Sequence, residues 1–208
     1  MNDKKIIGLT GLYCAGKNYI APFLEQRGLP VLDVDKLGHK VIEMEKERIL
    51  ARFGNDILDR EGRIDRKLLG AKVFGRDEEV AALEDIVHPG ANRETLAWIS
   101  AQTGRACVIN AALLHRSSVF NMLDAIIIVK APFMVRLLRA KKRDKLHWSA
   151  LLRRFFSQGK FSSQYLQKKT DIYIVENSGF FGFRERARQK KLEGRLDEIL
   201  SREGILKV

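Results

Sequence analysis

The chain has 208 residues, of which 45% are hydrophobic and 31% are charged, and its formal net charge is +12. This length suits one α/β domain with smaller inserted parts, and two cysteines exclude a disulfide-framework protein. No apolar run approaches the roughly 18 residues that span a bilayer, and the N-terminal run is too short for a signal peptide. We therefore expect a cytoplasmic protein with no membrane partner.

Five apolar segments predict the strands of a parallel sheet flanked by helices. They lie at residues 5–10, 29–35, 105–110, 124–130 and 172–177. The first two are separated by a glycine loop and a helix predicted at 19–26, so they form a βαβ unit. The predicted fold is α/β, with this sheet as its centre.

The region from 36 to 103 is predicted to be mainly helical. Helices are expected at 36–52, 65–74, 77–87 and 91–103, and later at 132–142, 148–156 and 184–202. Asp65 is a typical N-cap residue for the second helix. The sequence His88-Pro89-Gly90 is expected to break the helical pattern.

The stretch GLYCAGKN, Gly11 to Asn18, fits the phosphate-loop pattern G-x-x-x-x-G-K-[ST] in all but its last position. It follows a predicted strand and opens a helix, as that pattern requires. Successive backbone N–H groups and the helix N-terminus favour an anion, the two glycines permit unusual backbone angles, and Lys17 can reach the phosphates. The predicted nucleotide-binding residues here are Gly11, Leu12, Tyr13, Cys14, Ala15, Gly16, Lys17, Asn18 and Tyr19.

Asn18 stands where such loops place a serine or threonine whose hydroxyl ligates Mg²⁺. An amide oxygen is also a hard donor, so Asn18 is a candidate contact for the ion, with weaker binding. Cys14 has two interpretations: a thiol activated by the helix N-terminus, or a small loop residue, and the second is favoured.

Asp33 and Asp35 follow the second strand, and ligands of open α/β sheets bind beyond the carboxyl ends of strands. Asp33 is a candidate to accept a hydroxyl proton during phosphoryl transfer. Alternatively, both acids cap the helix that follows.

The segment from Arg136 to Lys169 carries eleven lysines and arginines against the single acid Asp144. It is predicted to be a nucleic-acid patch, a cover over a polyphosphate, or a solvated helical face. No zinc-finger spacing or RNP sequence accompanies it, so a nucleic-acid partner is not expected.

An ordered set of motifs resembles the dephospho-CoA kinase family. It consists of the loop above, VLDVD with His39 after it, FGNDILDREGRIDR, VF at 73–74, HP at 88–89, LLRAKKRD at 137–144, Gln158 and ENSG at 176–179. The resemblance implies a P-loop kinase that uses ATP and Mg²⁺ to phosphorylate the 3′-hydroxyl of dephospho-CoA, the last step of CoA synthesis. We expect a monomer or weak homo-oligomer.

The resemblance also implies how the chain is divided and which residues act. The core comprises 1–35, 104–135 and 171–208, the substrate-binding helical insert 36–103, and the lid 136–170. Asp33 is implied as the catalytic base, aided by Lys17, Arg139 and Arg143, and Asn177 as a neighbour of the adenine. The implied substrate-binding residues are Asp33, Asp35, His39, Arg66 and His88, although Arg66 and His88 also have structural interpretations, as an ion-pair partner and a helix cap.

The chain departs from the family pattern D-x-P-L-L-[FY]-E after the third strand, where it has Asn110-Ala111-Ala112-Leu113-Leu114-His115-Arg116. The lysine expected after Gln158 is Gln164. With Asn18 and Asn110 both neutral, Mg²⁺ is favoured less. The alternatives are therefore another small-molecule or nucleotide kinase, and a nucleotide-binding homologue with weakened catalysis.

Overall fold

The computed structural model describes residues 4–156, 165, 170–179 and 185–206. The chain divides into two compact units, one made of residues 1–32 with 102–208 and the other of residues 33–101. The predicted insert, 36–103, has slightly different bounds from the second unit. The predicted lid includes residues 157–164 and 166–169, which lie outside the described part, as do Gln158 and Gln164.

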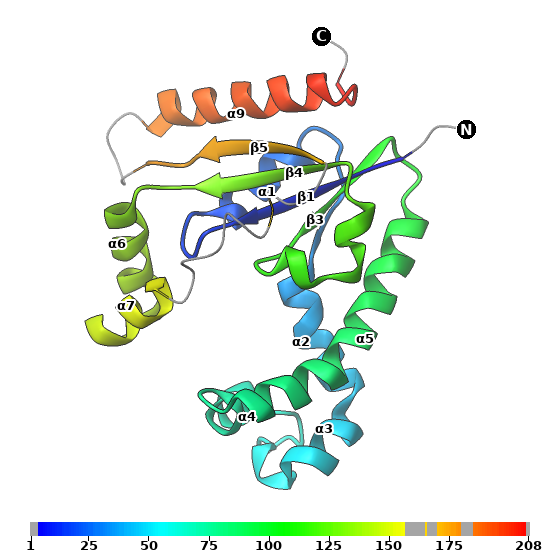
Figure 1. Ribbon diagram of the computed structural model, residues 1–208, viewed down its shortest axis with the longest axis vertical. Coiled ribbons are helices and arrows are strands. Elements are labelled where there is room, and N and C mark those ends of the chain that lie inside the picture. Colours follow the sequence, from blue (N-terminus) through cyan, green and yellow to red (C-terminus); the bar gives the residue numbers. More distant parts are fainter. Residues whose placement is uncertain (1–3, 157–164, 166–169, 180–184, 207–208) are drawn as a thin grey trace. The chain divides into compact units, whose positions relative to one another are not determined.

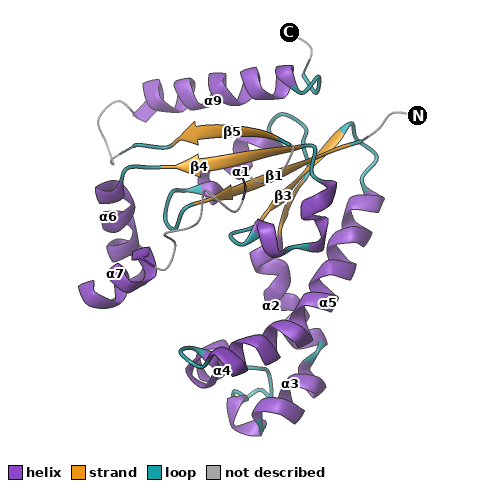
Figure 2. Cartoon of the chain, viewed as in Figure 1, coloured by secondary structure: helices purple, strands orange, loops and turns teal. Residues whose placement is uncertain are grey.

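A five-stranded sheet forms the centre of the first unit (Figures 1 and 2). Its strands are β1 (Lys5–Gly11), β2 (Val31–Asp33), β3 (Ala106–Asn110), β4 (Ala125–Lys130) and β5 (Asp171–Glu176). Their order is β2-β3-β1-β4-β5, and β1 pairs in parallel with both β3 and β4. The predicted α/β fold with a parallel sheet is confirmed.

Helices α1 (Lys17–Glu25) and α9 (Glu185–Arg202) cover one face of this sheet. Leu192 and Leu196 of α9 join one core cluster with Ile20 of α1 and Ile127 of β4. On the opposite face lie the 3₁₀ turns η2 (Leu114–Arg116) and η3 (Ser118–Met122). Leu114 of η2 packs so closely on Gly8 of β1 that a Cβ at Gly8 would collide with it. This gives the three-layer arrangement typical of α/β domains.

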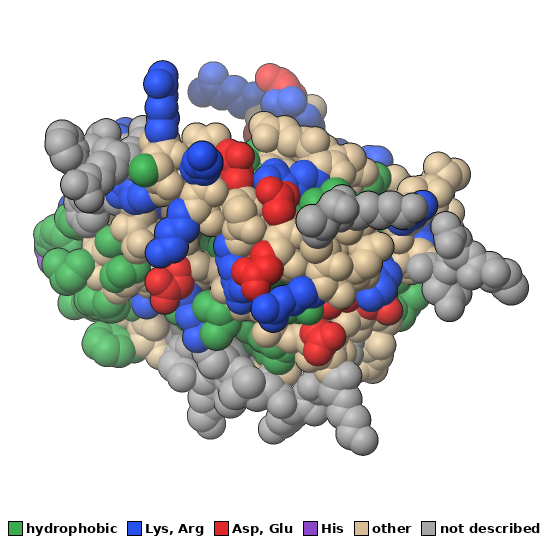
Figure 3. Space-filling model, turned by 90° about the horizontal axis from the view of Figure 1, so that it is seen from above, with side chains coloured by type: hydrophobic (Ala, Val, Ile, Leu, Met, Phe, Trp, Pro, Cys, Tyr) green, Lys and Arg blue, Asp and Glu red, His purple; other side chains and the backbone are tan. Residues whose placement is uncertain are grey.

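The remaining helices of the first unit are α6 (Phe133–Asp144) and α7 (Trp148–Phe156). They share a small apolar cluster built on Leu137 and Leu151. Seen from the side of α9, lysines and arginines intermingle with acidic side chains over the visible face (Figure 3). Among the described helices, none has the length and apolar character that a membrane crossing needs.

The second unit is helical and has its own core. It contains α2 (Val34–Met44), α3 (Lys46–Phe53), the turn η1 (Asn55–Ile57), α4 (Arg66–Val73) and α5 (Asp77–Ala101). Ile49, Ile57 and Leu69 are at most 2% exposed and pack in one cluster. The single helix predicted at 36–52 is wrong, because the backbone leaves helical geometry at Glu45 (φ −96°, ψ 20°).

The predicted break at His88-Pro89-Gly90 is also wrong. Helix α5 runs continuously from Asp77 to Ala101 and contains Pro89. Gly90 is buried, and a Cβ there would lie 2.7 Å from Val41 Cγ1 on α2. The glycine therefore permits close packing of α5 on α2, and this packing outweighs the local preference of proline to end a helix.

Candidate active site

The loop from Gly11 to Gly16 joins β1 to α1 and has the backbone form of an anion-binding turn. Cys14 (φ 58°) and Gly16 (φ 97°) both adopt left-handed conformations. A Cβ at Gly16 would also collide with Asn177 Nδ2, so the position requires glycine for two reasons. Helix α1 begins at Lys17, which sets the positive end of its dipole at the loop.

Two details of the predicted loop are wrong. The N–H of Leu12 donates to Val129 O of β4 at 3.3 Å and that of Ala15 to Leu12 O at 2.8 Å, so both donors already have partners within the protein. Gly11 has no left-handed backbone. A Cβ there would lie 2.8 Å from Val129 O, so the glycine is needed for close approach to β4.

Lys17, Asn18 and Asn110 meet at the end of β1 and β3. The ammonium of Lys17 donates to Asn18 Oδ1 and Asn110 Oδ1, each at 3.1 Å. Asn110 Nδ2 also donates to Asn18 Oδ1 at 3.1 Å. Asn110 is 1% exposed, and its position follows from the pairing of Leu9 in β1 with Asn110 in β3.

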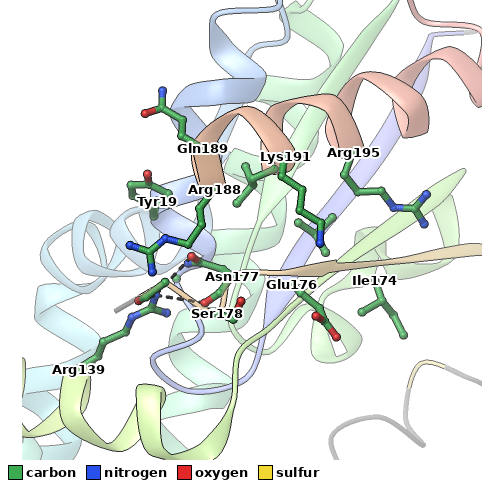
Figure 4. A pocket seen from close by; sticks show the side chains of 14 residues that line it. Tyr19, Arg139, Ile174, Glu176, Asn177, Ser178, Arg188, Gln189, Lys191 and Arg195 are labelled. Atoms are coloured by element: carbon green, nitrogen blue, oxygen red, sulfur yellow. Dashed lines mark hydrogen bonds between the residues drawn. The ribbon is translucent and has the colours of Figure 1, made fainter. Parts of the chain in front are cut away.

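Arg139 and Asn177 connect the loop to the segment after β5 (Figure 4). The guanidinium of Arg139 donates to Ala15 O at 3.1 Å, to Cys14 O at 3.4 Å and to Gly179 O at 2.9 Å. It also donates to both oxygens of Asn177, whose Nδ2 donates to Ala15 O at 2.9 Å. The structure thus gives Arg139 a role in holding the loop, in addition to the phosphate contact that was predicted.

A cavity of about 480 Å³ opens beside this connection, between β5 and α9. Figure 4 shows arginine and lysine side chains of α9 along one wall and Asn177 and Ser178 along another. Sequence reasoning missed Arg188, Lys191 and Arg195. Their i, i+3, i+7 spacing places them on one side of a helix, and this was the available signal.

Arg143 lies over the ring of Tyr13, with 5.1 Å from its guanidinium carbon to the ring centroid. It donates to Asp144 Oδ1 at 2.6 Å, which raises the pKa of Arg143 further above its usual range. Tyr13 also donates to Asp144. Arg136, which sequence reasoning did not select, donates to Tyr13 O at 3.5 Å.

Cys14 is half-buried in the loop, and burial raises the pKa of its thiol although Arg143 and Arg139 oppose the shift. A reactive thiolate needs a lowered pKa. The favoured interpretation of Cys14 as a small loop residue is therefore the better one.

The five residues predicted to bind the substrate belong to the second unit, where they lie at the start of a helix or on the surface. Asp33 ends β2 and caps α2, because its carboxylate accepts the N–H of Lys36 at 3.1 Å. The other four, Asp35, His39, Arg66 and His88, are exposed. His88 lies inside α5, so its interpretation as a helix cap is wrong.

Tyr165 lies against residues of β1 and η2. It is fully buried, and its hydroxyl lies 3.2 Å from His115 Nδ1 and 3.4 Å from Thr10 Oγ1. Burial, assisted by the charge of Arg116, lowers the pKa of His115. The neutral form of this histidine is thereby favoured.

Stability should therefore fall on acidification in a way that depends on His115. A group whose pKa is lowered by folding stabilises the protein above its unfolded pKa, about 6.5, and this stabilisation is lost as the pH falls through the folded pKa. In a His115→Phe variant, urea unfolding at pH 7.5 and 5.5 should show a smaller loss than in the wild type. Equal losses in the two proteins would show that His115 makes no such contribution.

Comparisons with known proteins agree with this geometry. A family model described as dephospho-CoA kinase matches residues 5–181. The dephospho-CoA kinase of Fusobacterium nucleatum is 33% identical over 175 residues, which cover 83% of this chain and 90% of that protein. The chain belongs to the dephospho-CoA kinase family. The resemblance indicated by the ordered motifs is thereby confirmed.

The fold of this chain is also similar to those of solved structures. The crystal structure of TT1252 from Thermus thermophilus has a TM-score of 0.78 and 28% identity, covering 96% of this chain and 97% of that one. Dephospho-CoA kinase from Campylobacter jejuni, with a TM-score of 0.62 and 23% identity, covers 96% of this chain and 97% of that one and shares the fold.

Proposed function

We propose that this chain transfers the γ-phosphoryl group of ATP to the 3′-hydroxyl of dephospho-CoA, giving CoA. The observation that carries the proposal is the anion-binding loop with Lys17 at the start of α1, in a chain that matches the dephospho-CoA kinase family over residues 5–181. A helix N-terminus preceded by residues in left-handed conformations binds phosphate through its backbone N–H groups, without requiring a charged side chain.

The nucleotide has a suitable place beside this loop. Its phosphates rest on the loop, and its adenine lies in the cavity next to Asn177, within reach of the arginines of α9. Lys17 and Arg143 reduce the repulsion between the phosphates and the attacking oxygen. Mg²⁺, when present, would supply further neutralisation of the phosphate charge.

The acceptor is assigned to the second unit. Asp33 accepts the proton of the 3′-hydroxyl as that oxygen attacks the γ-phosphorus, and the bond to the β-phosphate oxygen breaks to release ADP. Asp35, His39, Arg66 and His88 bind the substrate. That the segment from 136 to 170 acts as a lid and limits hydrolysis of ATP stays a prediction. The cytoplasmic location and the monomeric or weakly oligomeric state stay predictions.

A coupled assay tests the acceptor directly. With ATP and Mg²⁺, the full chain should produce CoA and ADP in equal amounts from dephospho-CoA. When AMP or CMP replaces dephospho-CoA as the acceptor, little ADP should form. Faster transfer to a nucleoside monophosphate would favour a nucleotide kinase instead.

A nucleotide-binding homologue with weakened catalysis is the second candidate, because neutral amides occupy positions 18 and 110. Tight ATP binding without any CoA formed, at all Mg²⁺ and Mn²⁺ concentrations, would support that candidate.

A further inference from the structure

The contacts among Lys17, Asn18 and Asn110 form a closed triangle of three hydrogen bonds, each 3.1 Å long. An ammonium has three donors and no acceptor, so it fixes the orientation of both amides with their oxygens toward it. Asn18 Oδ1 then accepts two hydrogen bonds and Asn110 Oδ1 accepts one. Both amide oxygens therefore face a cation of the protein itself.

The charges around the loop are strongly unbalanced. Arg139 donates to a carbonyl oxygen of the loop, Lys17 follows the loop as the first residue of α1, and Arg143 lies over Tyr13 within the loop. Asp144, an acid beside the loop, is engaged by Arg143 and by the hydroxyl of Tyr13. Among the described residues there is no group of three or more His, Cys, Asp or Glu side chains that could hold a metal ion.

These residues do not fit a divalent cation held by the first unit. Mg²⁺ in kinase sites is held by one or two carboxylates together with the phosphates. The amides here carry no charge, and their oxygens already accept from Lys17. A carboxylate at position 110 would attract the ion, but it would also neutralise Lys17 and repel the phosphates.

We propose that this site binds ATP through protein cations, without a metal ligand from the phosphate loop or β3. Metal-free ATP then binds at least as tightly as its magnesium complex, because the free nucleotide carries more negative charge. Asn18 and Asn110 position Lys17, contrary to the sequence-based prediction of Asn18 as a metal contact. The inference rests on the proposed ATP site and specifies how that site recognises the polyphosphate.

Calorimetric titration of the full chain with ATP tests this inference. The dissociation constant is measured in EDTA and again in excess Mg²⁺, without dephospho-CoA. The expected ratio of the metal-free value to the magnesium value is one or below. A wild-type ratio above about ten, which corresponds to tighter binding of the magnesium complex by about 1.4 kcal/mol, would overturn the proposal.

Restoring a carboxylate should reverse the preference. Asn110→Asp is expected to weaken metal-free ATP binding and to raise the ratio by about tenfold or more. Asn110 is buried, so Asn18→Asp, at an exposed position, provides a second variant if the first fails to fold. Asn121→Asp adds the same charge at an exposed position in η3 and should leave the ratio unchanged. An unchanged ratio in both site variants would also overturn the proposal.

The result is separable from the proposed function. A chain that binds metal-free ATP as expected but forms no CoA would contradict the kinase activity alone. A chain that forms CoA and yet binds ATP only with Mg²⁺ would contradict the metal inference alone.

Discussion

An Asp33→Asn variant should lose about 10³-fold in kcat for CoA formation while keeping its affinity for ATP. The carboxylate is proposed to accept the proton of the attacking hydroxyl, and an amide cannot do so. Asparagine remains a good N-cap, so the hydrogen bond from Lys36 N and the start of α2 should survive. The coupled assay gives kcat, and calorimetric titration gives the dissociation constant for ATP.

Asp65 provides a matched control in the same unit. It caps α4 as Asp33 caps α2, accepting from Lys67 N at 2.7 Å and Leu68 N at 3.3 Å. Asp65→Asn should therefore leave kcat unchanged. If Asp33→Asn also keeps its turnover, Asp33 is only a helix cap and another group accepts the proton. Measuring kcat of Asp35→Asn then tests whether Asp35 is that group.

An Arg139→Ala variant should lose both stability and ATP affinity. The truncation leaves the carbonyl oxygens of Ala15, Gly179 and Asn177 without their charged donor, at a cost of about 1–3 kcal/mol in the free energy of unfolding. The loop would no longer be tied to the segment after β5, so we expect the dissociation constant for ATP to rise about tenfold. Urea unfolding and calorimetric titration measure the two effects.

Arg143→Ala is the comparison that separates the roles of the two arginines. The side chain of Arg143 is 59% exposed, although that of Asp144 is only 14% exposed, and Arg143 donates to no carbonyl oxygen of the loop in the contacts described above. This variant should therefore lose less stability than Arg139→Ala. Reduced ATP affinity in Arg139→Ala with unaltered stability would assign Arg139 to the phosphates alone. Arg139→Lys should resemble the alanine variant, because a single ammonium cannot span acceptors on two segments.

Much of the fold could be predicted from the sequence because its signals are local. Each strand is a short apolar run that can be recognised from its own residues, and a glycine loop before Lys17 specifies a strand–loop–helix turn by itself. The amphipathic pattern of α9 was equally direct, with Leu192 and Leu196 buried and charged residues opposite. The same local rules failed at Pro89, where packing of Gly90 against α2 keeps one helix intact.

The phosphate loop, the α/β class and the family could be predicted because they depend on residue types at fixed spacing along the chain. The contacts by which Arg139 holds the loop, and by which Asn110 and Asn18 share Lys17, appear only in the folded chain. These contacts join residues more than ninety positions apart, and they exist because β3 pairs beside β1 and α6 follows β4. Such proximity depends on strand order and helix placement, which are set by burial of the whole sheet rather than by any short stretch of sequence.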